Sequence, residues 1–297
     1  MKIGTILPYK ENYTISKAQA AAIWVSDFYK FSKFKKENFI YGNTYGTDYL
    51  TPNYKNVKLK TLNSKIFSTT NEYCNEFIKI NDIQNFDIVE VHNRPLVFDY
   101  LKDKLNSKFI LYFHNDPLTM KGSITIKERN NLLKNCDKII FISKWVKNRF
   151  FKGLNKQFIN KTSIVYHSVN KQKKLSKKNK YITFVGKLNE SKGYDIYREA
   201  IIRILNKYKD WRAFSIGDES RERPIIKHNL HKELGFLKHN KVLNFLEKSE
   251  IAVVPSRWEE PFGRTALEAS SRGCATIVSN RGGLPETTDH SIILKKI

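Results

Sequence analysis

Residues 253–286 read VVPSRWEEPFGRTALEASSRGCATIVSNRGGLPE, and this stretch decides how the rest of the chain is interpreted. The apolar run just around its start, IAVVP at 251–255, predicts a buried parallel strand. A polar loop with Pro-Phe-Gly then leads into a helical pattern that stops at Gly273. A second apolar run, CATIVSN, and a Gly-Gly-Leu-Pro turn complete the segment. The order strand, loop, helix, strand predicts a βαβ unit.

The start of this predicted helix is a candidate anion site. The backbone N–H groups of Phe262, Gly263 and Arg264 lie there, where unpaired donors and the helix dipole favour a group such as a diphosphate. Glu260 and Glu268 bracket the same terminus, and two carboxylates disfavour an anion unless they bind something neutral, such as hydroxyl groups. The alternative is that Glu260 is only a helix-start carboxylate and Glu268 a solvated helix residue.

PSRWEEPFGRTALEA followed by RGGLPE resembles the donor-site signature of retaining GT-B glycosyltransferases of family 4 (glycosyl transferases group 1). The resemblance is specific because the glutamate pair, the Pro-Phe-Gly and the Gly-Gly-x-Pro-Glu turn occur together and in order. It implies that Glu260 contacts sugar hydroxyls and that Glu268 binds the ribose of the nucleotide. It also implies two Rossmann-like α/β domains that face each other across a cleft.

Two lysines follow the strand-like run that opens the second half. The turn FVGKLNESKG at 184–193 resembles the family's Gly-Arg-x4-Lys-Gly turn, whose cations bind the donor diphosphate. Lys192 matches that pattern by position. Lys187 replaces the usual arginine, which keeps the charge but loses the bidentate geometry. The alternative is that both are ordinary surface lysines in a turn.

Two histidines end neighbouring apolar runs of the first half. His114 closes FILYFH, and the carboxyl end of a strand in an open α/β sheet is where ligands bind. The resemblance implies that His114 faces the transferred sugar, which makes it a catalytic candidate together with Glu260 and Lys192. His92 closes VEVH and is a second candidate, on the acceptor side. The alternative for each histidine is a purely structural role.

Gly217 and Arg257 are weaker candidates for the nucleotide pocket. Gly217 ends the run WRAFSIG, and the resemblance implies that a glycine here lines this pocket. Arg257 flanks the acidic pair and is placed to touch the base or the sugar. Its neighbour Trp258 has two interpretations, a ligand contact or a packing residue.

Apolar runs alternate with helical patterns along the whole chain, which predicts a parallel, doubly wound sheet in each half. The lysine-rich segment 169–180 has no apolar periodicity and is the predicted linker. It separates an N-terminal Rossmann-like domain at 1–168 from a C-terminal one at 181–297, and the resemblance implies that the first is the acceptor side and the second binds the nucleotide-sugar. We expect the second domain to be short, because relatives continue past the Gly-Gly-x-Pro-Glu turn. The predicted strands are 3–7, 39–43, 57–62, 87–93, 109–115, 138–143, 163–169, 181–186, 211–217, 233–236, 251–255, 274–280 and 291–297, and the predicted helices are 13–31 (N-cap Thr14 or Ser16), 69–80, 95–105, 125–136, 143–151, 194–208, 238–248 and 264–272.

The net charge of +24 is concentrated in the first half and at the linker. Residues 1–170 contain 27 Lys and Arg against 14 Asp and Glu. This excess suits nucleic acid, an anionic membrane surface or an acidic or lipid-linked substrate, and it is also compatible with a merely solvated surface. No nucleic-acid-binding module is recognisable, so we expect no nucleic-acid partner.

The chain lacks the marks of export and of metal binding. Its start, MKIGTILPYK, enters a strand without a signal-peptide pattern, and no apolar run is long enough to span a membrane. Cys74, Cys136 and Cys274 are widely spaced and odd in number, which predicts free thiols. We therefore expect a cytoplasmic protein, with the inner face of the membrane as a further location.

The resemblance implies a glycosyltransferase that moves a sugar, a hexose by expectation, from a nucleoside-diphosphate sugar to a glycan or glycolipid hydroxyl with retention. Surface polysaccharide or lipopolysaccharide synthesis is the expected setting. No cofactor or metal is expected, because the lysines and the helix N-terminus can stabilise the departing diphosphate. The alternatives are a non-catalytic GT-B-like subunit or scaffold and, more distantly, a nucleic-acid-binding protein.

Overall fold

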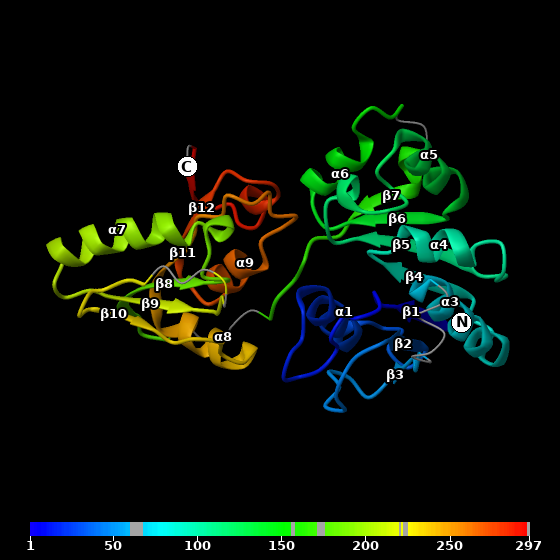
Figure 1. The fold of residues 1–297 in the computed structure, drawn as a ribbon, viewed down its shortest axis with the longest axis horizontal. Coiled ribbons are helices and arrows are strands. Elements are labelled where there is room, and N and C mark those ends of the chain that lie inside the picture. The colour runs from blue at the N-terminus through cyan, green and yellow to red at the C-terminus, as the bar shows by residue number, and fades with distance from the viewer. Residues whose placement is uncertain (60–67, 156–157, 171–175, 220, 222–224, 296–297) are drawn as a thin grey trace. The chain divides into compact units, whose positions relative to one another are not determined.

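The computed structural model describes residues 1–59, 68–155, 158–170, 176–219, 221 and 225–295. They form two compact units, Met1–His167 and Ser168–Ile297, called below the N-terminal and the C-terminal unit. Each unit contains one parallel sheet with helices packed on it (Figure 1). The prediction of two Rossmann-like α/β domains is therefore confirmed, whereas the cleft between them stays a prediction.

The sheet of the N-terminal unit has seven parallel strands in the order β3-β2-β1-β4-β5-β6-β7. The strand order reverses direction between β1 and β4, the place where open α/β sheets bind ligands. The strands are β1 (Ile3–Ile6), β2 (Asn38–Gly42), β3 (Tyr54–Asn56), β4 (Ile88–His92), β5 (Lys108–Phe113), β6 (Lys138–Phe141) and β7 (Thr162–Ile164). The helices are α1 (Ala20–Phe31), α3 (Thr69–Gln84), α4 (Pro95–Leu101), α5 (Ile126–Asn135) and α6 (Lys144–Phe151), with short 3₁₀ turns at Pro117–Thr119 and Ile159–Lys161.

Two predicted elements of this unit are wrong in position. The first helix begins at Ala20, not near Thr14 or Ser16, because Thr14 pairs with Tyr49 in an isolated β-bridge. The Glu11 carboxylate accepts the Ala22 N–H at 3.1 Å and so supplies a cap from a distance in sequence. The strand predicted at 57–62 is instead β3, which ends before Val57; residues 60–62 lie outside the described residues.

The sheet of the C-terminal unit has six parallel strands in the order β10-β9-β8-β11-β12-β13. The predicted βαβ unit is present as β11, α9 and β12, with Ile251 opposite Ala275. β8 begins at Asn179, inside the predicted linker, and residues 171–175 of that linker lie outside the described residues. The elements are β8 (Asn179–Val185), α7 (Tyr194–Lys207), β9 (Arg212–Ile216), β10 (His231–Glu233), α8 (His239–Lys248), β11 (Ser249–Val254), α9 (Arg264–Ser271), β12 (Ala275–Ser279) and β13 (Ile292–Leu294), with short 3₁₀ turns at Glu190–Lys192 and Leu284–Glu286.

The strands of this sheet bury both faces, as the near-continuous apolar runs of a helix-covered parallel sheet require. Phe184 of β8 packs with Tyr197 of α7 on one face. Ala252 of β11 packs with Leu246 of α8 and Ala269 of α9 on the other. Figure 1 shows α7 and α8 on opposite sides of the sheet. The two layers hold the strand ends in place, and the loops that carry the candidate site leave from these ends.

Among the described residues, no helix combines the length and the apolar character that a membrane crossing requires.

Candidate functional site

The turn at 281–286 holds the loop that carries Glu259 and Glu260, called below the acidic pair. Gly283 N–H donates to the Glu260 carbonyl at 2.6 Å, and Gly282 N–H donates to the Glu259 carboxylate at 2.7 Å. Gly282 has φ +57°, and a Cβ there would lie 2.1 Å from the Glu260 carbonyl oxygen. Only glycine allows backbone at this distance in this conformation. The glutamate-bearing loop and the Gly-Gly-x-Pro-Glu turn of the sequence signature are therefore bonded directly to each other.

The 3₁₀ turn Glu190–Lys192 holds the same loop from the other side. The Ser191 carbonyl accepts the N–H groups of Arg257 and Trp258 at 3.1 and 2.9 Å. Gly193 follows with φ +70°, and a Cβ there would lie 1.9 Å from the Pro255 carbonyl oxygen. This close approach brings Lys192 next to the acidic pair.

Lys192 and Glu260 form an ion pair, with Nζ 2.5 Å from Oε1. The Ser256 hydroxyl donates to the same oxygen at 3.1 Å. The side chains are 30% and 15% exposed, so the pair is partly shielded but open to a ligand. Lys192 was predicted to bind a diphosphate and Glu260 a sugar. In this structure each group binds the other.

The side chain of Lys187 is exposed and makes no hydrogen bond or ion pair with the residues that the structure describes. It follows Gly186, whose carbonyl oxygen would lie 1.7 Å from a Cβ at Gly217. Gly217 has φ +148°, so both the contact and the conformation require glycine. This requirement is a structural reason for Gly217, and its contact with a nucleotide stays a prediction.

The N-terminus of α9 lacks a side-chain cap. Its N-cap residue, Gly263, has φ +101°, and a Cβ there would lie 2.3 Å from the Leu284 side chain. The N–H groups of Gly263 and Thr265 have no acceptor among the described residues. Phe262 buries its ring beside them. The predicted anion site therefore has unused donors, as a diphosphate site needs.

Glu268 is buried, so the interpretation as a solvated helix residue is wrong. Its Oε1 accepts Arg264 Nε at 2.7 Å and His239 Nε2 at 2.8 Å. Burial alone would raise the pKa of Glu268. The hydrogen bond from His239 and the charge of Arg264 together hold this pKa below its ordinary value. The carboxylate is therefore charged and fixed in orientation, and its contact with a ribose stays a prediction.

Arg257 reaches α7 rather than the acidic pair. Its Nη2 lies 2.6 Å from Asp195 Oδ2 in the first turn of that helix. The predicted contact of Arg257 with a base or sugar stays a prediction, and it falls to the guanidinium donors that this ion pair leaves unused. Trp258 is 53% exposed, which excludes the packing interpretation and leaves its ring available to a ligand.

His114 and His92 form a buried pair in the N-terminal unit. His114 Nε2 lies 2.8 Å from His92 Nδ1, and Trp24 packs edge-on against the His114 ring. Burial lowers the pKa of His114 to about 3 and that of His92 far below its ordinary range, so both rings are neutral. His114 is only 5% exposed. Its predicted contact with a sugar stays a prediction.

The sequence analysis missed two residues that position carboxylates of the site, His239 beside Glu268 and Gly282 beside Glu259. His239 lies 29 positions before Glu268, and Gly282 lies 23 positions after Glu259. No local sequence pattern predicts contacts between residues that lie more than 20 positions apart, as these do. Within the described part of the chain, no group of three or more His, Cys, Asp or Glu side chains is arranged to hold a metal ion.

Comparisons with known proteins concern the family and the fold of this chain. Residues 167–293 match the family model described as Glycosyl transferases group 1. The chain is similar to an uncharacterized glycosyltransferase of Methanocaldococcus jannaschii, with 33% identity over 221 residues that cover 70% of this chain and 60% of the relative. It is also similar to an uncharacterized 42.6 kDa protein in the cps region of Klebsiella pneumoniae, with 29% identity over 188 residues, 59% of this chain and 48% of the relative. The chain thus spans 60% or less of the length of these two relatives.

The fold is that of solved glycosyltransferases. The crystal structure of Anabaena Alr3699/HepE in complex with UDP-glucose matches with a TM-score of 0.75 and 15% identity, over 99% of this chain and 85% of that one. This match supports the GT-B fold, two Rossmann-like domains in one chain. The match to the Glycosyl transferases group 1 model covers residues 167–293, whereas the structural match concerns the fold alone.

Proposed function

We propose that the protein transfers a sugar from a nucleoside-diphosphate sugar to an acceptor hydroxyl, with retention of the anomeric configuration. The observation that carries this proposal is the Lys192–Glu260 ion pair, held by two glycine-dependent contacts beside the uncapped start of α9. A cation and free N–H donors suit the diphosphate, and a carboxylate suits the hydroxyl groups of a sugar.

Binding of the donor would separate Lys192 from Glu260 and give each of them a partner on the donor. A diphosphate carries more negative charge than Glu260 and would attract Lys192, while the α9 N–H groups bind its oxygens. Glu260, released from Lys192, would then accept hydrogen bonds from the sugar. The same cations would stabilise the diphosphate as it leaves, so that no metal is needed. For retention, we propose attack on the face that the diphosphate leaves, with the leaving phosphate taking the proton of the acceptor.

We assign Glu268 to the ribose and His114 to the sugar on the resemblance of their sequence positions. UDP is the first nucleotide to test, because the structural neighbour was solved with UDP-glucose. A relative encoded in a cps region supports a role in surface polysaccharide synthesis, with lipopolysaccharide as the related setting. The cytoplasmic side of a membrane is the location that this role and the basic charge suggest.

The test is a calorimetric titration with UDP, GDP, ADP and dTDP. Wild type should bind one of them selectively, and Lys192→Met should weaken that binding by at least about tenfold, the cost of one charge-assisted hydrogen bond. Lys209→Met removes an exposed lysine of the same unit with no described partner and serves as the control. Equal affinity in wild type and Lys192→Met would contradict the proposed donor site.

A non-catalytic GT-B-like subunit is the second candidate. The observation that favours it is the mutual satisfaction of Lys192 and Glu260, which leaves this pair stable without any ligand. Failure of all four nucleotides to bind would support this candidate over the enzyme.

A further inference from the structure

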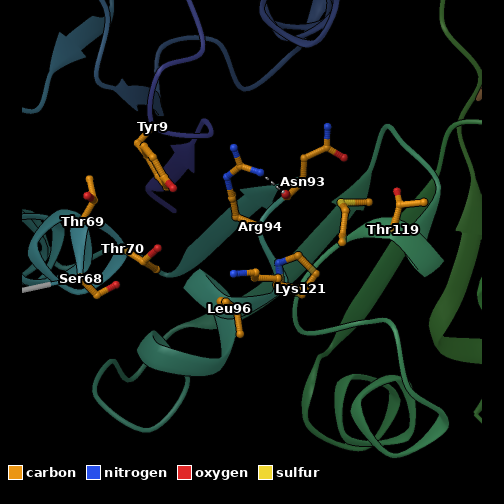
Figure 2. Close-up of a pocket in the computed structure, with 11 residues that line it drawn as sticks. Tyr9, Ser68, Thr69, Thr70, Asn93, Arg94, Leu96, Thr119 and Lys121 are labelled. Carbon is orange, nitrogen blue, oxygen red and sulfur yellow. Dashed lines mark hydrogen bonds between the residues drawn. The ribbon is translucent and has the colours of Figure 1, made fainter.

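A pocket of about 500 Å³ lies entirely within the N-terminal unit (Figure 2). Its lining includes Tyr9 after β1, Asn93 and Arg94 after β4, the first turn of α3 at 68–70 and the loop 119–121 after β5. The pocket therefore sits at the carboxyl ends of neighbouring parallel strands, where α/β sheets bind their ligands. Its volume suits a small molecule of sugar size rather than a lone ion.

Among the described residues, two cations line the pocket and no carboxylate does. Lys121 makes no hydrogen bond or ion pair with the residues that the structure describes. Arg94 donates from Nη1 to the Asn93 carbonyl at 3.3 Å and lies 5.2 Å above the Tyr9 ring. Its Nε is buried and has no partner among the described residues. A buried, unused guanidinium donor is costly unless a ligand accepts it.

The start of α3 adds neutral donors to these charges. The N-cap residue Ser68 makes no capping hydrogen bond, and the N–H groups of Thr69 and Thr70 have no acceptor among the described residues. Figure 2 shows Thr70 and Lys121 pointing into the hollow from opposite sides. A 16-residue helix directs the positive end of its dipole here.

Nearby carboxylates do not neutralise the pocket from within. Glu11 interacts with the charge of Arg94, but burial raises the pKa of Glu11 and its Oε1 is already bonded to Ala22 N–H. Glu72 lies buried in the first turn of α3 and does not line the pocket. Asp99 belongs to an adjoining hollow and pairs with Lys102. Lys121 thus has no carboxylate partner among the described residues, whereas the charge of Arg94 interacts with Glu11.

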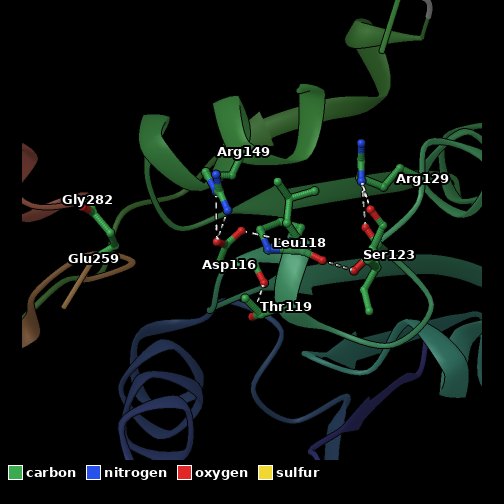
Figure 3. A network of polar contacts seen from close by, with 10 residues as sticks. Asp116, Leu118, Thr119, Ser123, Arg129, Arg149, Glu259 and Gly282 are labelled. Atoms are coloured by element: carbon green, nitrogen blue, oxygen red, sulfur yellow. Dashed lines mark hydrogen bonds and ion pairs between the residues drawn. The ribbon is translucent and has the colours of Figure 1, made fainter. Parts of the chain in front are cut away.

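The wall that carries Lys121 is held firmly. Arg149 of α6 binds Asp116 with Nε and Nη2 at 2.9 and 2.7 Å, and Arg129 donates to the Ser123 carbonyl at 3.1 Å (Figure 3). These contacts bracket the loop between residues 116 and 123. A site fixed before binding loses less entropy when its ligand arrives.

We propose that this pocket binds a phosphate group of the acceptor. Arg94 provides a planar fork of donors for the phosphate oxygens, Lys121 a second charge, and the first turn of α3 provides N–H and hydroxyl donors. The rest of the cavity, with the Tyr9 ring and hydroxyl groups, accommodates the attached sugar or headgroup. This inference rests on the proposed function, because it names the class of acceptor: a phosphorylated sugar or a phosphate-bearing lipid.

The test titrates glucose 6-phosphate, glucose and glucuronate into the full chain by calorimetry. Wild type should bind glucose 6-phosphate most tightly, and the double variant Arg94→Met/Lys121→Met should bind it at least about tenfold more weakly. Arg94→Lys should lie between them, because it keeps the charge and loses the fork. Lys30→Met, at the end of α1 and outside the pocket, should match wild type. Circular dichroism of each variant verifies its fold.

A second arm identifies the source of the phosphate. Vesicles of phosphatidylcholine with and without phosphatidic acid are sedimented with the same variants. Loss of binding in the double variant but not in Lys30→Met supports phosphate recognition, from a soluble sugar in the first arm or from a lipid in the second. Independence from Arg94 and Lys121 in both arms, or equal binding of glucuronate and glucose 6-phosphate, would overturn the proposal.

UDP titrations separate this proposal from the function on which it rests. The double variant should bind UDP as wild type does, because its substitutions lie outside the C-terminal unit. Glucose 6-phosphate binding without nucleotide binding would contradict the proposed function and leave phosphate recognition standing. Nucleotide binding with no effect of the double variant on either phosphate probe would contradict only the phosphate pocket.

Discussion

The candidate site of the C-terminal unit and the pocket of the N-terminal unit differ in whether their charged side chains have partners. In the C-terminal unit, Lys192 pairs with Glu260, and Glu268 is held by Arg264 and His239. In the N-terminal unit, Lys121 has no described partner, and Arg94 has a buried donor that is unused. The first region is positioned by its own charges, so a ligand must exchange partners with them. The second offers a ligand a lysine without a described partner and an unused guanidinium donor.

The largest effect is expected at the backbone contacts of the first region. Gly193→Ala would drive a Cβ into the Pro255 carbonyl oxygen and force the loop off the Glu190–Lys192 turn. We expect a loss of about 3 kcal/mol or more in the free energy of unfolding, together with a loss of nucleotide binding. Chemical denaturation measures the first and calorimetry the second.

Gly235→Ala is the matched control for this substitution. Gly235 also has a positive φ, +64°, but nothing lies within 4 Å of a Cβ there. We expect a loss of about 1 kcal/mol, the strain of the conformation alone. Equal losses at the two glycines would mean that the loop contact contributes nothing.

The next effect concerns transfer itself. Lys192→Met should lower the rate of sugar transfer by about 100-fold or more, because it removes the charge that we propose to stabilise the departing diphosphate. The measurement is a radiolabelled transfer assay once the donor base is known. Lys209→Met should leave the rate unchanged, and comparable rates in both variants would contradict the role of Lys192.

A smaller effect is expected at Glu268, and it depends on pH. The pKa of Glu268 is lowered in the folded state, so its stabilising contribution is present above the unfolded pKa and is lost as the pH falls through the folded one. Glu268→Gln should therefore destabilise the protein at pH 7 by about 1–3 kcal/mol, because it weakens buried charge-assisted hydrogen bonds. This difference should shrink in acid, below the ordinary glutamate pKa of 4.5. Thermal unfolding from neutral to acidic pH would show it, and a constant difference would contradict this assignment.

The smallest effect is expected from the second region. The double variant at Arg94 and Lys121 should raise the KM for a phosphorylated acceptor by about tenfold, with the KM for the donor unchanged. Added salt should reduce the difference between wild type and variant, because it screens exposed charges such as Lys121. A change in the KM for the donor instead would contradict the assignment of Arg94 and Lys121 to the acceptor.

The sequence allowed most of the fold to be predicted, because its apolar runs are short, regular and buried on both faces. β11, α9 and β12 lie where periodicity and Gly273 place them. The start of α1 could not be predicted, because its cap comes from Glu11, outside the helix. The strand β3 was misplaced because the apolar pattern continues past its last paired residue.

The candidate site was less predictable than the fold. The pattern identified Lys192, Glu260 and Glu268, but not that Lys192 pairs with Glu260 or that Glu268 pairs with His239. These pairings depend on how distant loops meet, which periodicity does not encode. The pocket at Arg94 and Lys121 was missed for the same reason, since its walls run from Tyr9 to Lys121, far apart along the chain.

The most direct test of the partner exchange compares UDP dissociation constants for wild type, Lys192→Met and Glu260→Gln in one calorimetric series. If a diphosphate replaces Glu260 as the partner of Lys192, Lys192→Met should weaken binding by at least about tenfold. Glu260→Gln should bind UDP as tightly as wild type or more tightly, because the competing carboxylate is gone. Lys192→Met with the affinity of wild type, or equal losses in the two variants, would contradict the exchange.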